Sequence, residues 1–261
     1  MFADRVKELS ASGIRKVFDL ASKMKNPVNF SIGQADFDVP DVIKEGAIKA
    51  IKEGKNRYTV TQGIQPLKNK VREHLQKTRN IEPENLFITS GTSGGLLTAF
   101  MVLINPEDEV LLPDPYFVMY KHLVNLASGK PVYYDLYPDF QLNVDEIEKK
   151  ITNKTKIILL NSPSNPTGAI FQKEDIEKLA KLAKKHDLYI ITDEIYETFI
   201  YEQKHHSVAT YYPEKSVVLG GFSKTYGMPG WRMGFAAGPY QLIDKMITLQ
   251  QFSFVCAPTP A

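Results

Sequence analysis

Apolar residues along the chain fall into short runs, separated by stretches in which apolar positions recur with a helical period. A run of consecutive apolar residues is typical of a strand that is buried on both faces of a sheet. Such runs occupy residues 85–89 (NLFIT), 109–113 (EVLLP), 131–135 (PVYYD), 156–161 (KIILLN), 188–193 (LYIITD) and 216–220 (SVVLG). Each of these runs is therefore predicted to form a strand.

Helices are predicted between these strands. Residues 93–103 follow a glycine-rich turn, residues 117–126 follow the second strand, and residues 173–186 place their apolar side chains on one helical face. Buried strands that alternate with helices predict an α/β fold, in which helices cover both faces of a mostly parallel sheet.

The two ends of the chain depart from this pattern. Residues 27–32 (PVNFSI) lead into Gly33 and Gln34, and a further helix is expected after residue 40. We interpret residues 1–40 as an N-terminal arm that packs against a second, smaller domain. At the other end, a helix is predicted to begin near Tyr240, and the sequence stops at APTPA.

The composition is that of an ordinary globular protein, with 261 residues, 43% hydrophobic and 24% charged. The net charge of +2 and the scattered basic residues do not form the stripe that nucleic-acid binding requires. A single cysteine, Cys256, excludes an internal disulfide and fits a reducing compartment. No apolar run is long enough to span a bilayer or to form a signal peptide, so a cytoplasmic protein is expected.

Polar residues follow several of the predicted strands. Ser90 begins a glycine-rich turn, residues 161–168 follow the fourth run, Asp193 ends the fifth, and Lys224 follows the sixth. In open α/β sheets, ligands bind beyond the carboxyl ends of the strands. These strand ends together predict a composite site.

The turn at residues 90–95 (SGTSGG) has the chemistry of a phosphate cradle, because free N–H groups at the start of the next helix attract anions. It matches neither a P-loop nor a dinucleotide fingerprint, and an ordinary glycine-rich helix start is the alternative. Arg232 is the only arginine in the second half of the chain, and a guanidinium can hold a phosphate with two parallel hydrogen bonds.

Asp193 and Lys224 each have two interpretations. A carboxylate after an apolar strand is a helix cap or an ion-pair partner, or it is the counter-ion of a protonated heterocyclic nitrogen. Lys224 is either a solvated loop residue or an amine whose pKa is lowered by burial, which makes it a nucleophile. The five histidines show no metal-ligand spacing and are interpreted as surface or loop residues.

These segments together resemble the class I and II aminotransferases, which belong to fold type I of the pyridoxal-phosphate (PLP) enzymes. The resemblance runs from about Gly33 to the last residue, and the lysine motif matches from Gly221 to Gly234. The other matching segments follow in the family's order and are Tyr58, Ser90–Gly91–Thr92, Asn165–Pro166–Thr167–Gly168 and Asp193–Glu194–Ile195–Tyr196.

The resemblance implies a seven-stranded type of sheet, as in the large domain of PLP-dependent transferases. Residues 1–40 are then an arm that belongs to the small domain, and residues 41–261 form the PLP-binding large domain. The family's C-terminal small domain, with the arginine that pairs with the substrate carboxylate, is absent from this chain, and no arginine follows Arg232. We therefore expect the chain alone to bind PLP weakly and to transaminate poorly.

The resemblance also implies the central roles. Lys224 carries the cofactor as a Schiff base and, once substrate releases it, moves the proton during transamination. Asp193 pairs with the ring nitrogen and keeps it protonated. Asn165 and Tyr196 hydrogen-bond to the ring oxygen. The protein thereby positions a cofactor that supplies the chemistry itself.

Further residues of the site are implied in the same way. Tyr116 stacks on the cofactor ring, Tyr58 reaches the phosphate of a neighbouring subunit in a homodimer, and Gly33, with Asn165, contacts the substrate. Gly221 stands where many relatives have a serine, so one phosphate hydrogen bond is expected to be missing. The phosphate contacts are assigned to Ser90, Gly91, Thr92 and Arg232.

The function expected from this resemblance is transfer of an amino group between an amino acid and a 2-oxo acid. A PLP-dependent lyase or decarboxylase of the same fold shares nearly all of these residues. A non-catalytic binding module would need a partner domain, and an NAD enzyme would need a glycine fingerprint that this chain lacks. Thr92 replaces the lysine of some bacterial aspartate-specific relatives, which disfavours that one mode of side-chain recognition but leaves aspartate, alanine and aromatic amino acids open as substrates.

Overall fold

A computed structural model of the chain describes residues 3–7, 13, 17, 20–26, 28 and 33–261. Its strands are β1 (Asn85–Ser90), β2 (Glu109–Asp114), β3 (Lys130–Asp135), β4 (Thr155–Asn161), β5 (Tyr189–Asp193), β6 (Ser216–Gly221) and β7 (Met233–Gly238). Its helices are α1 (Asp4–Lys7), α3 (Asp41–Lys52), α4 (Gln65–Arg79), α5 (Gly91–Leu103), α6 (Met119–Leu126), α7 (Val144–Lys150), α8 (Lys173–Lys185) and α9 (Tyr240–Ser253).

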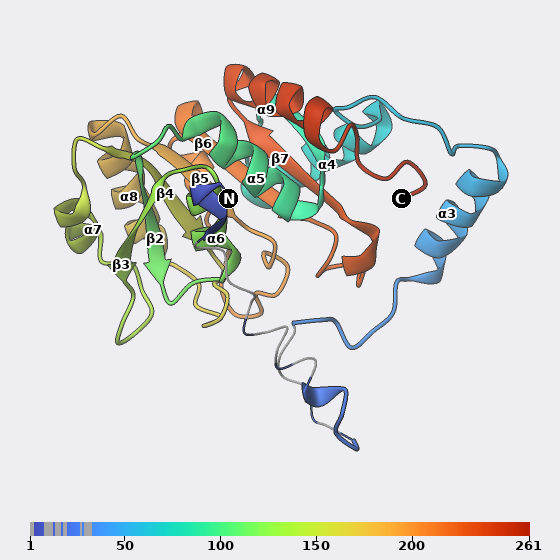
Figure 1. The fold of residues 1–261 in the computed structure, drawn as a ribbon, viewed down its shortest axis with the longest axis horizontal. Helices are drawn as coiled ribbons and strands as arrows, with labels where there is room; N and C mark the ends of the chain where they lie inside the picture. Colours follow the sequence, from blue (N-terminus) through green and yellow to red (C-terminus); the bar gives the residue numbers. More distant parts are fainter. Residues whose placement is uncertain (1–2, 8–12, 14–16, 18–19, 27, 29–32) are drawn as a thin grey trace.

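The strands form one seven-stranded sheet in the order β1-β7-β6-β5-β4-β2-β3 (Figure 1). All neighbouring pairs are parallel except those that involve β7, which runs antiparallel to both β1 and β6. The predicted mostly parallel α/β sheet is confirmed. β7 was missed because its sequence, MGFAAG, is rich in glycine and alanine, which have weak strand preference.

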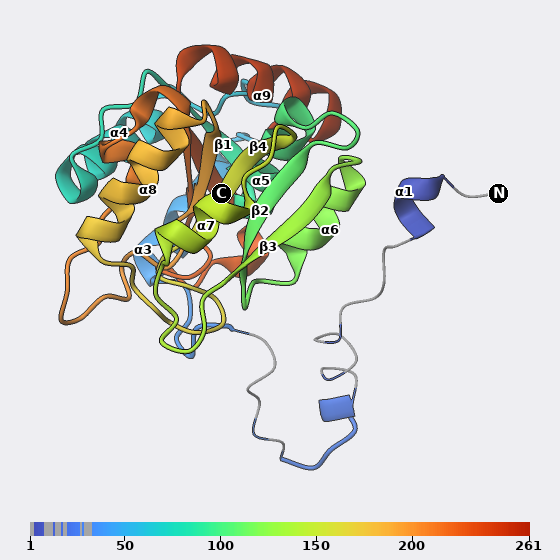
Figure 2. The ribbon, with the colours of Figure 1, turned by 90° about the vertical axis from the view of Figure 1, so that its left-hand side faces the viewer.

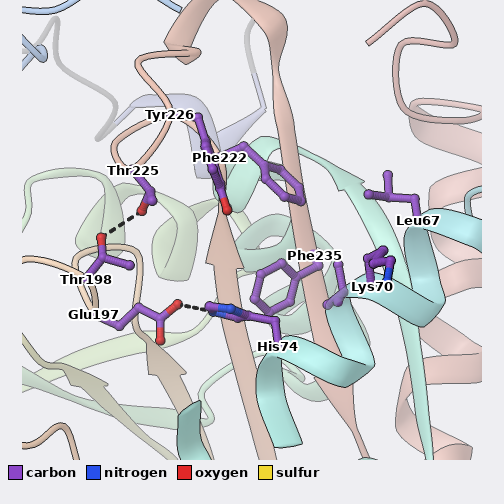
Figure 3. Close-up of a pocket in the computed structure, with 11 residues that line it drawn as sticks. Leu67, Lys70, His74, Glu197, Thr198, Phe222, Thr225, Tyr226 and Phe235 are labelled. Atoms are coloured by element: carbon purple, nitrogen blue, oxygen red, sulfur yellow. Dashed lines mark hydrogen bonds and ion pairs between the residues drawn. The ribbon is translucent and has the colours of Figure 1, made fainter. Parts of the chain in front are cut away.

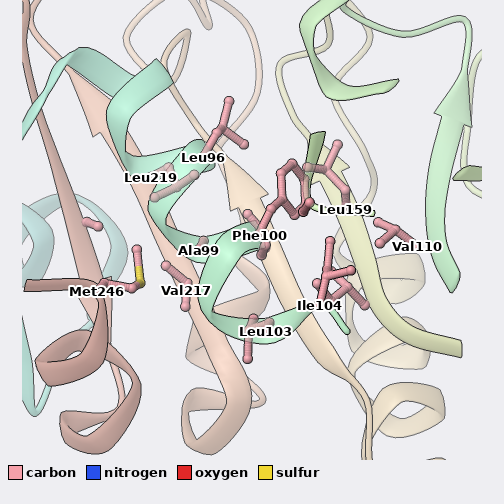
Figure 4. Close-up of a cluster of buried hydrophobic side chains, with 14 of the residues drawn as sticks. Leu96, Ala99, Phe100, Leu103, Ile104, Val110, Leu159, Val217, Leu219 and Met246 are labelled. Atoms are coloured by element: carbon pink, nitrogen blue, oxygen red, sulfur yellow. The ribbon is translucent and has the colours of Figure 1, made fainter. Parts of the chain in front are cut away.

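Helices α5, α6 and α9 cover one face of the sheet (Figure 2). Phe100 from α5 and Met246 from α9 pack against Val110, Leu159 and Val217 of the strands, all of them buried (Figure 4). Helix α5 is apolar nearly all round, because it lies between the sheet and the two other helices of this face.

Helices α4, α7 and α8 cover the opposite face. Leu179 of α8 packs with Ile158 of β4 and Ile190 of β5, whereas Leu75 of α4 packs with Val218 of β6. Neighbouring strand residues such as Val217 and Val218 therefore face opposite layers, as the strand period of two requires. The helices on both faces leave the strand ends as the place for a site.

The carboxyl ends of β1, β4, β5 and β6 lie at the same edge of the sheet. Asn161 of β4 lies opposite Asp193 of β5. On β7, Met233 lies opposite Ser90 of β1, and the next residue, Gly234, lies opposite Gly221 of β6. Because the antiparallel β7 separates β1 from β6, these two strands point the same way. The predicted composite of strand ends is therefore present.

The N-terminal part of the chain contributes little to the core. No residue of α3 is buried, and Figure 1 shows this helix standing apart from the sheet. Residues 1–2, 8–12, 14–16, 18–19, 27 and 29–32 of the predicted arm lie outside the described residues, so the assignment of residues 1–40 to an arm stays a prediction. Within the described part of the chain, each helix is too short or too polar to cross a membrane.

Candidate active site

Lys224 lies in the loop that follows β6, among residues of the strand-end edge. Its amine nitrogen is 5.7 Å from the centre of the Tyr196 ring and donates a hydrogen bond to the carbonyl of Gly33. Burial lowers the pKa of Lys224, and the nearby charge of Asp193 opposes this change only in part. The side chain is thus a partly desolvated amine beside a carboxylate, which is the environment of a nucleophilic lysine.

Asp193 ends β5 and is 4% exposed. Its Oδ2 accepts a hydrogen bond from the Tyr120 hydroxyl at 2.9 Å, and its Oδ1 accepts one from the backbone N–H of Ile195 at 3.3 Å. Burial nevertheless dominates and raises the pKa of Asp193 to about 6, although both hydrogen bonds and Lys224 lower it. A buried acid without a close cationic partner is costly for the fold.

Tyr120, from α6, is a residue that sequence reasoning missed. Its side chain is fully buried, and burial, followed by the charge of Asp193, raises its pKa well above the ordinary value. The hydroxyl is therefore a permanent donor to Asp193. A tyrosine on the buried face of a helix gives no signal of this contact, since its partner lies 73 residues away.

Asn165 and Tyr196 meet at the same edge. The Asn165 amide nitrogen lies 3.4 Å from the Tyr196 hydroxyl, and its backbone N–H is held by the side chain of Asn161 at 2.7 Å. Asn161 also donates to the carbonyl of Asp193 at 2.9 Å. The segment after β4 is thus bound to the end of β5, which keeps Asn165, Tyr196 and Asp193 together.

The turn after β1 and the guanidinium of Arg232 form a compact cradle. Gly91 has a φ of +68°, and a Cβ at this position would lie 2.5 Å from Arg232 Nη2. Gly234 of β7 passes so close that its Cβ would lie 2.7 Å from the backbone nitrogen of Thr92. The start of α5 therefore presents backbone N–H groups beside a positive charge, an arrangement that favours a phosphate.

The glycine at position 221 has a steric reason. A Cβ there would lie 2.8 Å from the Thr92 hydroxyl, which donates to the carbonyl of Gly220 at 3.2 Å. Thr92 thus occupies the space that a larger residue at position 221 would need.

Tyr116 and Tyr58 are placed differently from the other predicted residues. Tyr116 follows β2 and stacks on Tyr133, with ring centres 5.3 Å apart. Tyr58 lies between α3 and α4, and its side chain is 84% exposed. Neither residue contacts Lys224 or Asp193 within the described structure, so their predicted contacts to the cofactor and to a partner subunit stay predictions.

A second group of charged residues lies on the opposite side of the turn that follows β5. Arg79 of α4 contacts the carboxylates of Glu194 and Glu197 at 3.1 and 2.6 Å. His74 lies 2.6 Å from Glu197, and His205 lies 2.9 Å from Glu194 (Figure 3 shows the His74 contact). His205 lies in a loop, as predicted, but its side chain is 8% exposed because it packs against Glu194.

Comparison with known proteins identifies a family whose members resemble this chain. The family model for aminotransferase class I and II matches residues 25–261. An aspartate aminotransferase of Pyrococcus abyssi is 41% identical over 98% of this chain, and an aromatic-amino-acid aminotransferase of Thermococcus litoralis is 40% identical over the same share. The chain spans 68% of the length of each.

Solved structures give the same result. A structure of aspartate aminotransferase from Thermus thermophilus with maleate superposes with a TM-score of 0.95, at 33% identity. The superposition covers all of this chain and 70% of that protein.

Proposed function

The chain belongs to the class I and II aminotransferases, and we propose that it transfers amino groups with PLP held on Lys224. The observation that carries this assignment is the pairing of two groups at neighbouring strand ends. Lys224, after β6, and Asp193, at the end of β5, are close enough for the charge of each to change the pKa of the other. A PLP site needs both groups on either side of one pyridine ring.

The residues present suit the cofactor. PLP carries a phosphate, a basic ring nitrogen, a ring oxygen and an aldehyde. The cradle of Ser90, Gly91 and Thr92 with Arg232 suits the phosphate, because a side chain at Gly91 would fill it. When bound, PLP supplies an electron sink for the bond that breaks at the substrate's α-carbon.

The side chains have distinct tasks in this proposal. The amine of Lys224 would hold the cofactor covalently and, once released, would accept the proton from the substrate's α-carbon and pass it to the carbon that carried the cofactor's aldehyde. The carboxylate of Asp193 holds the ring nitrogen in its protonated form, since a cation beside this buried acid relieves its desolvation. Asn165 and Tyr196 donate hydrogen bonds to the ring oxygen, a role that their 3.4 Å separation supports.

The remaining assignments extend the proposal. We take Tyr116 as the aromatic that covers the ring, and Gly33 and Asn165 as substrate contacts, which the bond from Lys224 to the Gly33 carbonyl supports. The exposure of Tyr58 suits a residue that reaches the phosphate in the second subunit of a homodimer. The substrates are an amino acid and a 2-oxo acid, and the names of the relatives favour aspartate or an aromatic amino acid.

Two features of the proposal rest on composition and resemblance alone. The single cysteine favours a cytoplasmic enzyme. Residues 41–261 are taken as the PLP-binding domain, with residues 1–40 as an arm of the small domain.

The test is a titration with PLP, up to the millimolar range, followed by absorbance. Wild-type protein should give a band of the lysine-bound cofactor, and Lys224→Ala should not. Lys245→Ala is the matched control, since this lysine is exposed on α9. Addition of an amino acid should then convert the bound cofactor to its amine form. A band that survives Lys224→Ala would remove the assignment, and loss of substrate without the amine form would indicate a lyase.

A further inference from the structure

The turn after β5 carries side chains in two directions. Asp193 and Tyr196 face the edge where Lys224 lies, whereas Glu194 and Glu197 reach back to α4. Arg79, the last residue of α4, contacts both of these carboxylates. The guanidinium of Arg79 therefore holds the turn at Glu194 and at Glu197. Glu194 follows Asp193 in the sequence, and Glu197 follows Tyr196.

The geometry of these contacts differs at the two points. Arg79 Nη2 lies 2.6 Å from Glu197 Oε2, and its Nε donates to the same oxygen at 2.9 Å. Arg79 Nη1 lies 3.1 Å from Glu194 Oε2 as an ion pair without hydrogen-bond alignment. The planar fork of a guanidinium can serve two carboxylates at once, which a lysine ammonium at the same place cannot do equally well.

These charges are buried. The side chain of Arg79 is 1% exposed, and those of Glu194 and Glu197 are 0% and 12% exposed. Burial alone would raise the pKa of Glu194, but His205 and Arg79 lower it to about 2. Burial would likewise raise the pKa of Glu197, but its contacts with His74 and Arg79 outweigh burial and lower it. Both carboxylates are therefore ionised, and removal of Arg79 would leave buried negative charges without their partner.

The same turn is also joined to the loop of Lys224. The hydroxyls of Thr198 and Thr225 lie 2.9 Å apart, and Thr225 follows Lys224 directly. Thr198, Thr225, Glu197 and His74 line one small cavity behind this loop (Figure 3). A shift of the turn would therefore move the groups on both sides of the proposed cofactor.

We propose that Arg79 is a positioning residue for the amino-transfer reaction, which sets the placement of Asp193 and Tyr196 through its contacts with Glu194 and Glu197. The proposal rests on the proposed function, because it concerns the same site. Arg79 itself touches neither substrate nor cofactor. It fixes the orientation of the Asp193 carboxylate and the Tyr196 hydroxyl toward the site.

The experiment compares Arg79→Lys and Glu197→Gln with wild type. Arg72→Lys is the matched control, because Arg72 lies two turns earlier on α4 and donates to the carbonyl of Pro83. For each protein the PLP dissociation constant, the pH midpoint of the absorbance change of the bound cofactor, and the melting temperature without PLP are measured. A residue with a merely structural role changes only the last quantity.

We expect Arg79→Lys and Glu197→Gln to weaken PLP binding about tenfold and to move the pH midpoint. Loss of a residue that orients a ligating side chain has an effect of this size at metal sites. Arg72→Lys should leave both values unchanged. If Arg79→Lys does not fold, Glu197→Gln decides, since it keeps the size of the side chain. Melting temperatures that fall while both PLP values stay at wild type would overturn the proposal. Absence of a Lys224-dependent band in wild type would overturn the proposed function instead, and this inference with it.

Discussion

Replacement of Tyr120 by phenylalanine isolates a single hydrogen bond to the proposed counter-ion of the cofactor. The Tyr120 hydroxyl is fully buried and donates to Asp193 Oδ2 at 2.9 Å. Phenylalanine keeps the ring, so the packing of α6 against the sheet should persist. The carboxylate of Asp193 would then keep only the 3.3 Å bond from the Ile195 N–H.

The size of the effect follows from the charge of the acceptor. A hydrogen bond to a charged group contributes about 1.5 to 3 kcal/mol, and about 1.4 kcal/mol corresponds to a tenfold change in proton affinity. Loss of this bond should raise the pKa of Asp193 from about 6 to between about 7 and about 8 in the cofactor-free protein. At pH 7 the ionised fraction should fall from about nine tenths to between about one half and about one tenth.

The assay is PLP affinity at pH 7 and at pH 9. Only ionised Asp193 pairs with a protonated ring nitrogen, so Tyr120→Phe should lose about twofold to tenfold in affinity at pH 7 relative to pH 9, beyond the change in wild type. Tyr134→Phe is the control, because this fully buried hydroxyl donates to the carbonyl of Leu159 at 2.8 Å rather than to an acid. Equal pH dependence in wild type and Tyr120→Phe would refute the reasoning.

Three further results are expected. Gly91→Ala should weaken PLP binding at least about tenfold in the same titration, because its Cβ would meet Arg232 at 2.5 Å and φ is +68°; wild-type affinity would argue against the cradle. Leu75→Ala should lower the free energy of unfolding by about 2 to 5 kcal/mol in urea, since Leu75 is fully buried between α4 and the sheet, and a loss below about 1 kcal/mol would contradict this core assignment. The lowered pKa of Glu194 means that its contribution, about 3 kcal/mol, is present above about pH 4.5 and is lost as the pH falls toward about 2; Glu194→Gln should flatten that part of the stability profile.

The sequence was sufficient for those features that depend on local pattern. The apolar runs that became β1, β4, β5 and β6 were placed within one or two residues, and the polar residues at their ends lie at one edge of the sheet as predicted. Each of these strands is a short apolar run followed by turn residues, which distinguishes it from the longer helices. Lys224 and Asp193 were singled out as candidates because unusual residue types stand at or shortly after the ends of such strands.

The features that were missed depend on contacts between distant segments. Arg79 meets Glu197 across 118 residues, and no local pattern marks either residue as a partner of the other. Helix α4, which carries Arg79, has a strongly polar sequence and was not predicted, although its narrow apolar face packs on the sheet. The strand β7 begins at the end of the lysine motif and was not recognised as a strand, because its glycines serve close backbone contact rather than side-chain packing.

The contrast between Asp193 and Glu194 gives the strongest physical reason to place a ligand at this edge. The two carboxylates are neighbours in sequence and both are buried. Glu194 accepts hydrogen bonds from Thr192 and Ser207 and is paired with Arg79 and His205, so its pKa falls to about 2. Asp193 has no cation within ion-pair distance among the described residues, and its pKa is raised to about 6.

A fold that can surround one acid with cations leaves its neighbour without them only at a cost in stability. That cost disappears when a ligand brings a positive charge to Asp193, because burial then strengthens the attraction rather than opposing ionisation. The pyridine ring of PLP would bring this positive charge on its protonated nitrogen if its aldehyde carbon were held by the nearby Lys224. The opposite pKa shifts of two neighbouring acids therefore distinguish Glu194, which is paired with Arg79, from Asp193, which we propose pairs with the cofactor.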